Sequence, residues 1–146
     1  MAITSAICNS FKQEILEAEH NFTASTGNTF NLALYDSDAS LGAGTTAYTT
    51  SEEITNTSGT AYTAKGKALT SVTPTLDSST AVCDFADVSW TSASFTARGC
   101  MIFNDSASGD PSVCCIDFGG DKTATNGTFT IQFPTADTSD AIIRIA

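Results

Sequence analysis

Residues 29–34, TFNLAL, decide the fold class, because from this point the spacing of apolar side chains changes from about 3.6 residues to 2. Phe30, Leu32 and Leu34 alternate with two other residues. Successive side chains of a β-strand point to opposite faces of the sheet. The pattern therefore predicts a strand with one buried face.

Downstream of this stretch the sequence predicts many short strands joined by polar connections. Residues 36–47, rich in Gly, Ser and Asp, predict a long loop. Pro134 ends the last alternating stretch, since proline has no N–H for the ladder. Turn signals lie at Thr57-Ser58-Gly59, Gly109-Asp110-Pro111 and Asn126-Gly127, and strands are expected at 61–64, 67–73, 80–85, 87–91, 94–103, 112–118, 127–133 and 141–145. This spacing is typical of an antiparallel β-sandwich or a barrel-like domain.

Upstream of the strands the period is helical. Ile7, Phe11, Ile15 and Ala18 recur at spacings of four and three, which predicts an N-terminal amphipathic α-helix. Its apolar face is a candidate packing or interface surface, because such a stripe must pack against the β-rich core or against another subunit. We therefore expect a single domain over residues 1–146, with the helix in 1–20 and the β-rich core in 29–146.

The charge and amino-acid composition of the chain limit the classes of binding partner. The chain of 146 residues carries 16 acidic and 6 basic side chains, a formal charge of −10. Binding to nucleic acid or to an anionic membrane needs clustered Lys or Arg, so neither partner is expected. The 24 threonines and 17 serines favour strands and turns. The first residues lack a basic signal region and no apolar run could span a bilayer, so we expect synthesis in a cytoplasm.

No residue pattern points to catalysis, a cofactor or a metal. His20, the single histidine, is expected to contact the last helical carbonyls or solvent. The adjacent Cys114 and Cys115 lack the spacing of zinc ligands, and the run from Asp36 to Ser40 lacks the glycine and the glutamate that complete a calcium loop. The remaining aspartates are expected at solvated turns and strand ends: Asp84, Asp87, Asp105, Asp110, Asp117 and Asp121. We therefore predict a protein that is not an enzyme.

Four segments together resemble a family of small structural proteins of tailed bacteriophages. They are ICNSFKQE at 7–14, FADVSW with FTARG at 85–90 and 95–99, DFG with DK at 117–119 and 121–122, and TIQFP running to AIIRI at 130–134 and 141–145. The resemblance implies a virion component made in the bacterial host cytoplasm, either a capsid decoration protein on the outer surface or a neck, collar or tail accessory. Implied partners are other copies of the chain, as in a trimer, and the major capsid protein. No catalytic residues carry over.

Two cysteines depart from the family picture. In a hairpin of 94–103 with 112–118, pairing Met101 with Cys114 places Cys100 opposite Cys115, and both then face outward. Directly opposed side chains have Cβ atoms about 4.5–5.5 Å apart, which approaches disulfide geometry. An internal disulfide, a bridge to a neighbouring subunit and two free thiols all remain open.

A second function class is a carbohydrate-binding or host-adhesion module. Such a module would present exposed aromatic rings, and the candidates are Tyr35, Tyr48, Tyr62 and Trp90. Packing of the same rings in the core is the alternative.

Overall fold

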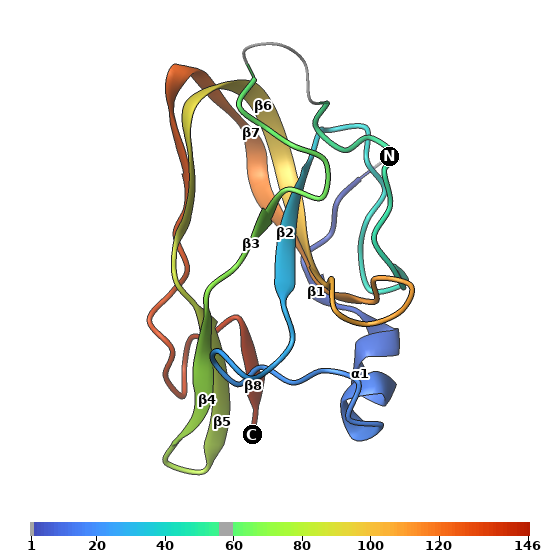
Figure 1. Ribbon diagram of the computed structural model, residues 1–146, viewed down its shortest axis with the longest axis vertical. Helices are drawn as coiled ribbons and strands as arrows, with labels where there is room; N and C mark the ends of the chain where they lie inside the picture. Colours follow the sequence, from blue (N-terminus) through green and yellow to red (C-terminus); the bar gives the residue numbers. More distant parts are fainter. Residues whose placement is uncertain (1, 56–59) are drawn as a thin grey trace.

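The computed structural model describes residues 2–55 and 60–146 (Figure 1). The described chain is mainly β, with two antiparallel sheets and one short N-terminal helix, which confirms the predicted fold class. The elements are β1 (Ala6–Ile7), α1 (Asn9–Leu16), β2 (Phe30–Tyr35), β3 (Lys67–Ala68), β4 (Ser71–Asp77), β5 (Thr80–Phe85), β6 (Val88–Asn104), β7 (Ser112–Ile131) and β8 (Ile143–Ile145). The turn predicted at 57–59 lies outside the described residues.

A long hairpin of β6 and β7 organises the first sheet, whose strand order is β1-β7-β6-β2-β3. The second sheet, β4-β5-β8, lies at the lower end of this hairpin in Figure 1. Pairs of predicted strands are each one continuous strand here. β6, from Val88, joins the strands predicted at 87–91 and 94–103, and β7, which ends at Ile131, joins those predicted at 112–118 and 127–133. β-Bulges with positive φ at Ser92 and at Asn126 lie where the sequence predicted the strands to be interrupted. Asn126 and Gly127 lie inside β7, so the turn predicted there is wrong. The strand predicted at 61–64 is wrong as well.

Aromatic rings fill the space between the sheets and the helix. Phe22 stacks on Phe30 of β2 with centroids 4.3 Å apart, and Phe30 lies 5.8 Å from Phe85 of β5. Phe11 is buried and holds α1 against this cluster, 6.0 Å from Phe22. The cluster thus joins four separate parts of the chain in one core.

The helix is shorter than predicted, and two residues of its expected apolar face lie outside it. Ile7 pairs with Cys114 as part of β1, so α1 begins only at Asn9. Ala18 has φ of 59° and is exposed, because the helix has ended at Leu16. Phe11 and Ile15 do pack on the core, as expected. The helix face therefore serves internal packing at its centre and is not a continuous interface.

A segment without regular strands lies on the first sheet, and we call residues 36–55 with 60–66 the cover segment. Its anchor is the buried Glu53, whose carboxylate accepts hydrogen bonds from the hydroxyls of Tyr48 and Tyr62, both at 2.6 Å. The Lys65 backbone N–H donates to the same carboxylate at 2.8 Å. Gly66 (φ 66°) ends the segment close to β2, where a Cβ would lie 1.8 Å from the Leu32 carbonyl oxygen. Only glycine fits this approach.

The cover segment buries the second face of the first sheet. Tyr48 stacks on Phe103 with centroids 4.7 Å apart, and the Cys115 sulfur lies 3.9 Å from the carbonyl oxygen of Gly42. Phe30 and its partner Asn104 lie on the opposite face of the first sheet, where Phe30 contacts the second sheet. All residues from 99 to 104 are consequently buried, whichever face they point to.

Candidate functional site

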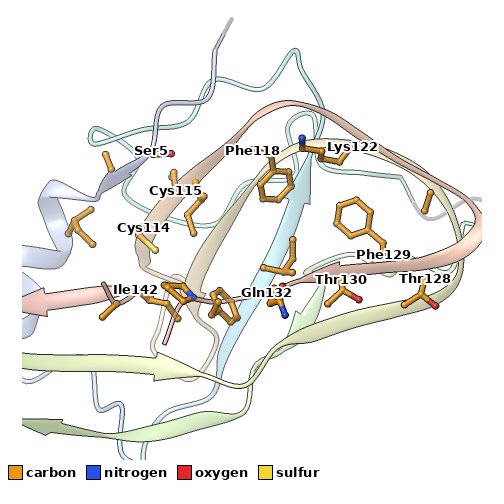
Figure 2. Close-up of a pocket in the computed structure, with 18 of the residues that line it drawn as sticks. Ser5, Cys114, Cys115, Phe118, Lys122, Thr128, Phe129, Thr130, Gln132 and Ile142 are labelled. Carbon is orange, nitrogen blue, oxygen red and sulfur yellow. The ribbon is translucent and has the colours of Figure 1, made fainter. Parts of the chain in front are cut away.

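A groove of about 790 Å3 runs along β7, between β1 and the segment that follows β7 (Figure 2). Phe118 and Phe129 point into it from β7, with Lys122 beside Phe118. The other principal apolar walls are Ala6, Ile7, Ile116, Ile131, Phe133, Pro134 and Ile142. The groove is open to solvent along its length.

A wide bulge in β7 shapes the upper part of this groove. Ala97 pairs with Lys122 and Gly99 with Asp117, so one residue of β6 faces four of β7. Gly119 takes a φ of 75° in the bulge, and its N–H donates to the Asp117 carboxylate at 3.0 Å. This bond, helped by the Arg98 guanidinium at 3.1 Å, holds the pKa of Asp117 below its usual value. The bulge turns Phe118 out of the regular ladder and into the groove.

The residues that line the groove show that it follows an edge of the first sheet. Every residue from 128 to 134 contributes to the wall. Neighbouring residues in a strand point to opposite faces, so a pocket that touches all of them must run beside the strand. Within the described residues, β1 pairs with β7 at only two positions, Ala6 with Cys115 and Ile7 with Cys114. Further along that edge the Asp117 and Gly119 N–H groups donate to the Ser5 hydroxyl and the Asp117 carboxylate, and no other described strand pairs with the edge, which lies next to an apolar trough.

The groove is equipped for apolar contact more than for chemistry. Lys122 is the one charged side chain in its wall, and no hydrogen bond or ion pair joins it to another described residue. Cys114 lies in the wall, but burial raises the pKa of its thiol, which keeps it protonated and unreactive. Among the described residues the wall holds no histidine or carboxylate to act as a general base.

His20 is buried in a polar network, so the expectation that it contacts helical carbonyls or solvent is wrong. Its Nε2 lies 2.8 Å from a carboxylate oxygen of Glu14, and Asn104 donates from Nδ2 to its Nδ1 at 3.2 Å. Its ring also lies 5.0 Å from that of Phe11. The chain folds back after α1 to place His20 in the aromatic core, which ties the helix to the end of β6.

Three carboxylates meet at the start of the cover segment. One oxygen from each of Asp36, Asp38 and Glu52 lies within 4.8 Å of the others, an arrangement that could hold a hard cation. The acidic run in the sequence contains the two aspartates but not Glu52, which the backbone brings near through a 3.1 Å hydrogen bond from Asp36 N–H to the Glu52 carbonyl oxygen. Asp38 and Glu52 are exposed, so water also solvates this cluster.

The predicted pairing of Cys100 with Cys115 is wrong by one residue. Cys100 lies opposite Ile116, and Cys115 lies opposite Met101. A shift of one residue moves a side chain to the other face, so the two cysteines point to opposite sides of the sheet. Both are buried free thiols, and the cover segment closes the face of the sheet that carries Cys115.

The aromatic residues proposed for carbohydrate binding are not an exposed platform. Tyr35, Tyr62 and Trp90 are buried, and Tyr48 is half-buried against Phe103. The hydroxyls of the three tyrosines bind within the protein, as when Tyr35 donates to the Thr49 carbonyl oxygen at 2.7 Å. The packing alternative therefore holds for these four rings.

Comparisons with protein families, with curated proteins and with solved structures found no match to this chain. In the part of the chain that the structure describes, α1 is too short to cross a membrane, and no other helix could do so.

Proposed function

We propose that this chain is a non-enzymatic structural protein of a tailed-bacteriophage particle, a capsid decoration protein that attaches through the groove along β7. Its occupant is an extended segment of a neighbouring virion protein, such as the major capsid protein, which adds to the unpaired edge of β7. Other copies of the chain, as in a trimer, are further partners on the outer surface of the particle.

The observation that carries the proposal is the apolar trough beside an unpaired strand edge. An added strand satisfies the backbone groups of such an edge, while pockets beside it select alternate side chains. Phe118, Phe129 and Ile131 supply apolar anchors of the kind that dominate interface energies. The net charge of −10 disfavours packaged DNA and suits the outside of a particle. The resemblance of four segments to phage structural proteins supports the same class.

Two other roles belong to the same proposal. A neck, collar or tail accessory would use the groove in the same way, with a different neighbour. A host-surface carbohydrate-binding module is less well supported, since the rings expected to contact sugar are buried.

Mass spectrometry and electron microscopy of particles from the bacteriophage that encodes the chain test the proposal. We expect the protein in purified particles, with density from a neighbouring protein beside β7. Absence of the chain from complete particles would overturn the proposal, and density on the neck or tail would select the accessory role.

A pair of variants tests the groove itself. Phe118→Ala removes a ring from the groove, whereas Leu76→Ala removes an apolar side chain that is 72% exposed on β4, away from the groove. Each variant is added to particles that lack the protein, after its folding is checked by urea denaturation. We expect Phe118→Ala to weaken binding at least about tenfold and Leu76→Ala to leave it unchanged. Equal binding of both folded variants would exclude the groove as the contact.

A further inference from the structure

Cys8 and Cys115 form a thiol pair at the junction of β1, α1 and β7. Ala6 pairs with Cys115, and the Cys8 N–H donates to the Val113 carbonyl oxygen at 3.0 Å, so β1 runs beside β7 up to this point. Both sulfurs lie 3.9 Å from the same carbonyl oxygen, that of Gly42 in the cover segment. The Cys115 thiol also hydrogen bonds to the sulfur of Cys8.

The two thiols have opposite protonation behaviour. The hydrogen bond from Cys115 stabilises the Cys8 thiolate, and with a weaker bond from Ser112 it outweighs the effects of burial and of the Glu14 charge, lowering the pKa of Cys8 to about 7. The same contact, together with burial, raises the pKa of Cys115. At neutral pH the pair therefore holds a nucleophilic thiolate beside a thiol.

The other cysteines are inert by comparison. Burial raises the pKa of Cys83 and of Cys100 to about 12 in each case, and that of Cys114 also lies well above the usual value. All three stay protonated at physiological pH. Selectivity for one pair among five thiols thus follows from their surroundings.

We propose that Cys8 and Cys115 are a redox-active dithiol that low-molecular-weight disulfides convert to an internal disulfide. The Cys8 thiolate attacks one sulfur of the small disulfide, which forms a mixed disulfide and releases one small thiolate. That thiolate takes the proton of Cys115, whose sulfur then attacks the Cys8 sulfur and releases the second small thiolate. The protein loses two electrons, and the small disulfide gains them as two reduced thiols.

Access to the pair depends on the N-terminal strand. The exposed fractions of Cys8 and Cys115 are 0% and 1%, so a small disulfide can reach them only after a local opening of the structure. β1 offers the easiest opening, because only two residue pairs hold it to β7. The resulting disulfide would fasten β1 and the start of α1 to β7, beside the groove whose wall includes Cys115.

Incubation of the folded full chain with oxidised glutathione tests the proposal. We expect the thiol count, measured after denaturation, to fall from five to three, with a loss of two hydrogens in mass and a Cys8–Cys115 link in the peptide map. A count that stays at five, a stable glutathione adduct or a different pair in the map would overturn it. The peptide map is made on the unaltered protein, so this test does not depend on the folding of a variant.

Matched serine variants add a second arm. Cys8→Ser should keep its four thiols, and Cys115→Ser should stop at the mixed disulfide, with three thiols and one bound glutathione. Cys83→Ser, which removes a buried thiol of β5, should still lose two. Loss of two thiols in Cys8→Ser would overturn the assignment. The oxidation rate should rise about tenfold between pH 6 and pH 8, as for a thiol that ionises near pH 7. A rise of about seventy-five-fold, as for an ordinary thiol, would contradict the role of Cys8 as the attacking group.

Discussion

The two halves of the β6–β7 hairpin follow different rules of burial although they belong to the same two strands. The half next to the turn between β6 and β7, residues 99–104 and 112–115, is the proximal half, and every residue in it is buried. In the distal half, residues 88–97 alternate between buried and exposed positions over most of their length. The second sheet and the cover segment close both faces of the proximal half, whereas the distal half has one open face (Figure 1).

The difference shows that burial in a strand is decided by what lies on each face. Alternation identifies a core face only where the other face meets water. The cover segment is polar and irregular, yet it closes a face because Glu53 binds two tyrosines and the backbone of Lys65. A loop held in this way has the same effect on the sheet as a third layer.

The largest expected effect separates the two halves by cavity formation. Ile102→Ala removes a side chain that is 0% exposed in the proximal half and should lower the free energy of unfolding by about 2–5 kcal/mol. Ile131→Ala, at a half-buried position of the distal half, should cost about 1–2 kcal/mol, because it leaves no closed cavity. Urea denaturation of both variants measures the difference, and equal losses would break the comparison.

Alkaline pH should weaken the cover of the proximal half. Burial is the main cause that raises the pKa of Tyr48, to about 12, and those of Tyr35 and Tyr62 further, with Glu53 adding to each. Because these phenols ionise near pH 10 in the unfolded chain, stability is complete below pH 10 and falls as the pH rises above it. Each fully buried phenol should cost about 1.4 kcal/mol at pH 11.

Phenolate absorbance and urea denaturation between pH 9 and pH 12 check this prediction. These three are all the tyrosines of the chain, so the signal reports on the cover segment and its contacts with β2 and β6. A midpoint near pH 10 in the folded protein would mean that the phenols are open to water.

The smallest expected effect compares two hydroxyl groups. Ser112 is buried in the proximal half and donates to the Thr45 carbonyl oxygen at 2.8 Å, so Ser112→Ala should cost about 1 kcal/mol. Thr96 bonds to Thr123 at 2.8 Å on the exposed face of the distal half, where Thr96→Ala should change stability by less than about 0.5 kcal/mol. Thermal or urea denaturation of the two variants would sharpen the comparison, and the reverse order would contradict it.

Sequence patterns predicted the elements whose environment is simple. The alternation at Phe30, Leu32 and Leu34 identified β2, and the range 80–85 matches β5. The Gly109-Asp110-Pro111 turn is confirmed, since it lies between β6 and β7 with positive φ at Gly109 and Asp110. Local propensity and the spacing of apolar residues are sufficient in such places.

The candidate site depended on information that the sequence does not display. The bulge at 118–121 shifts the pairing of β7, so Phe118 enters a groove that no spacing rule would reveal. The Cys100 error came from a one-residue register shift and from an unforeseen layer above Cys115. Glu52 and Cys8 find their partners through contacts between distant parts of the chain, which the spacing of neighbouring residues does not encode.

The order of the chain has a consequence for how this protein reaches its native state. The cover segment and β2 are made before the hairpin whose face and edge they close, and β1 can meet β7 only after β2 to β6 have been made. Such long sequence separations between contacting strands imply slow folding, with β6 and β7 able to pair first as a local unit. Until the cover segment packs on the newly formed sheet, Met101 and Phe103 remain exposed to solvent, and the folding intermediate can aggregate through them. The risk of aggregation therefore ends when Glu53 and its two tyrosines dock on the sheet.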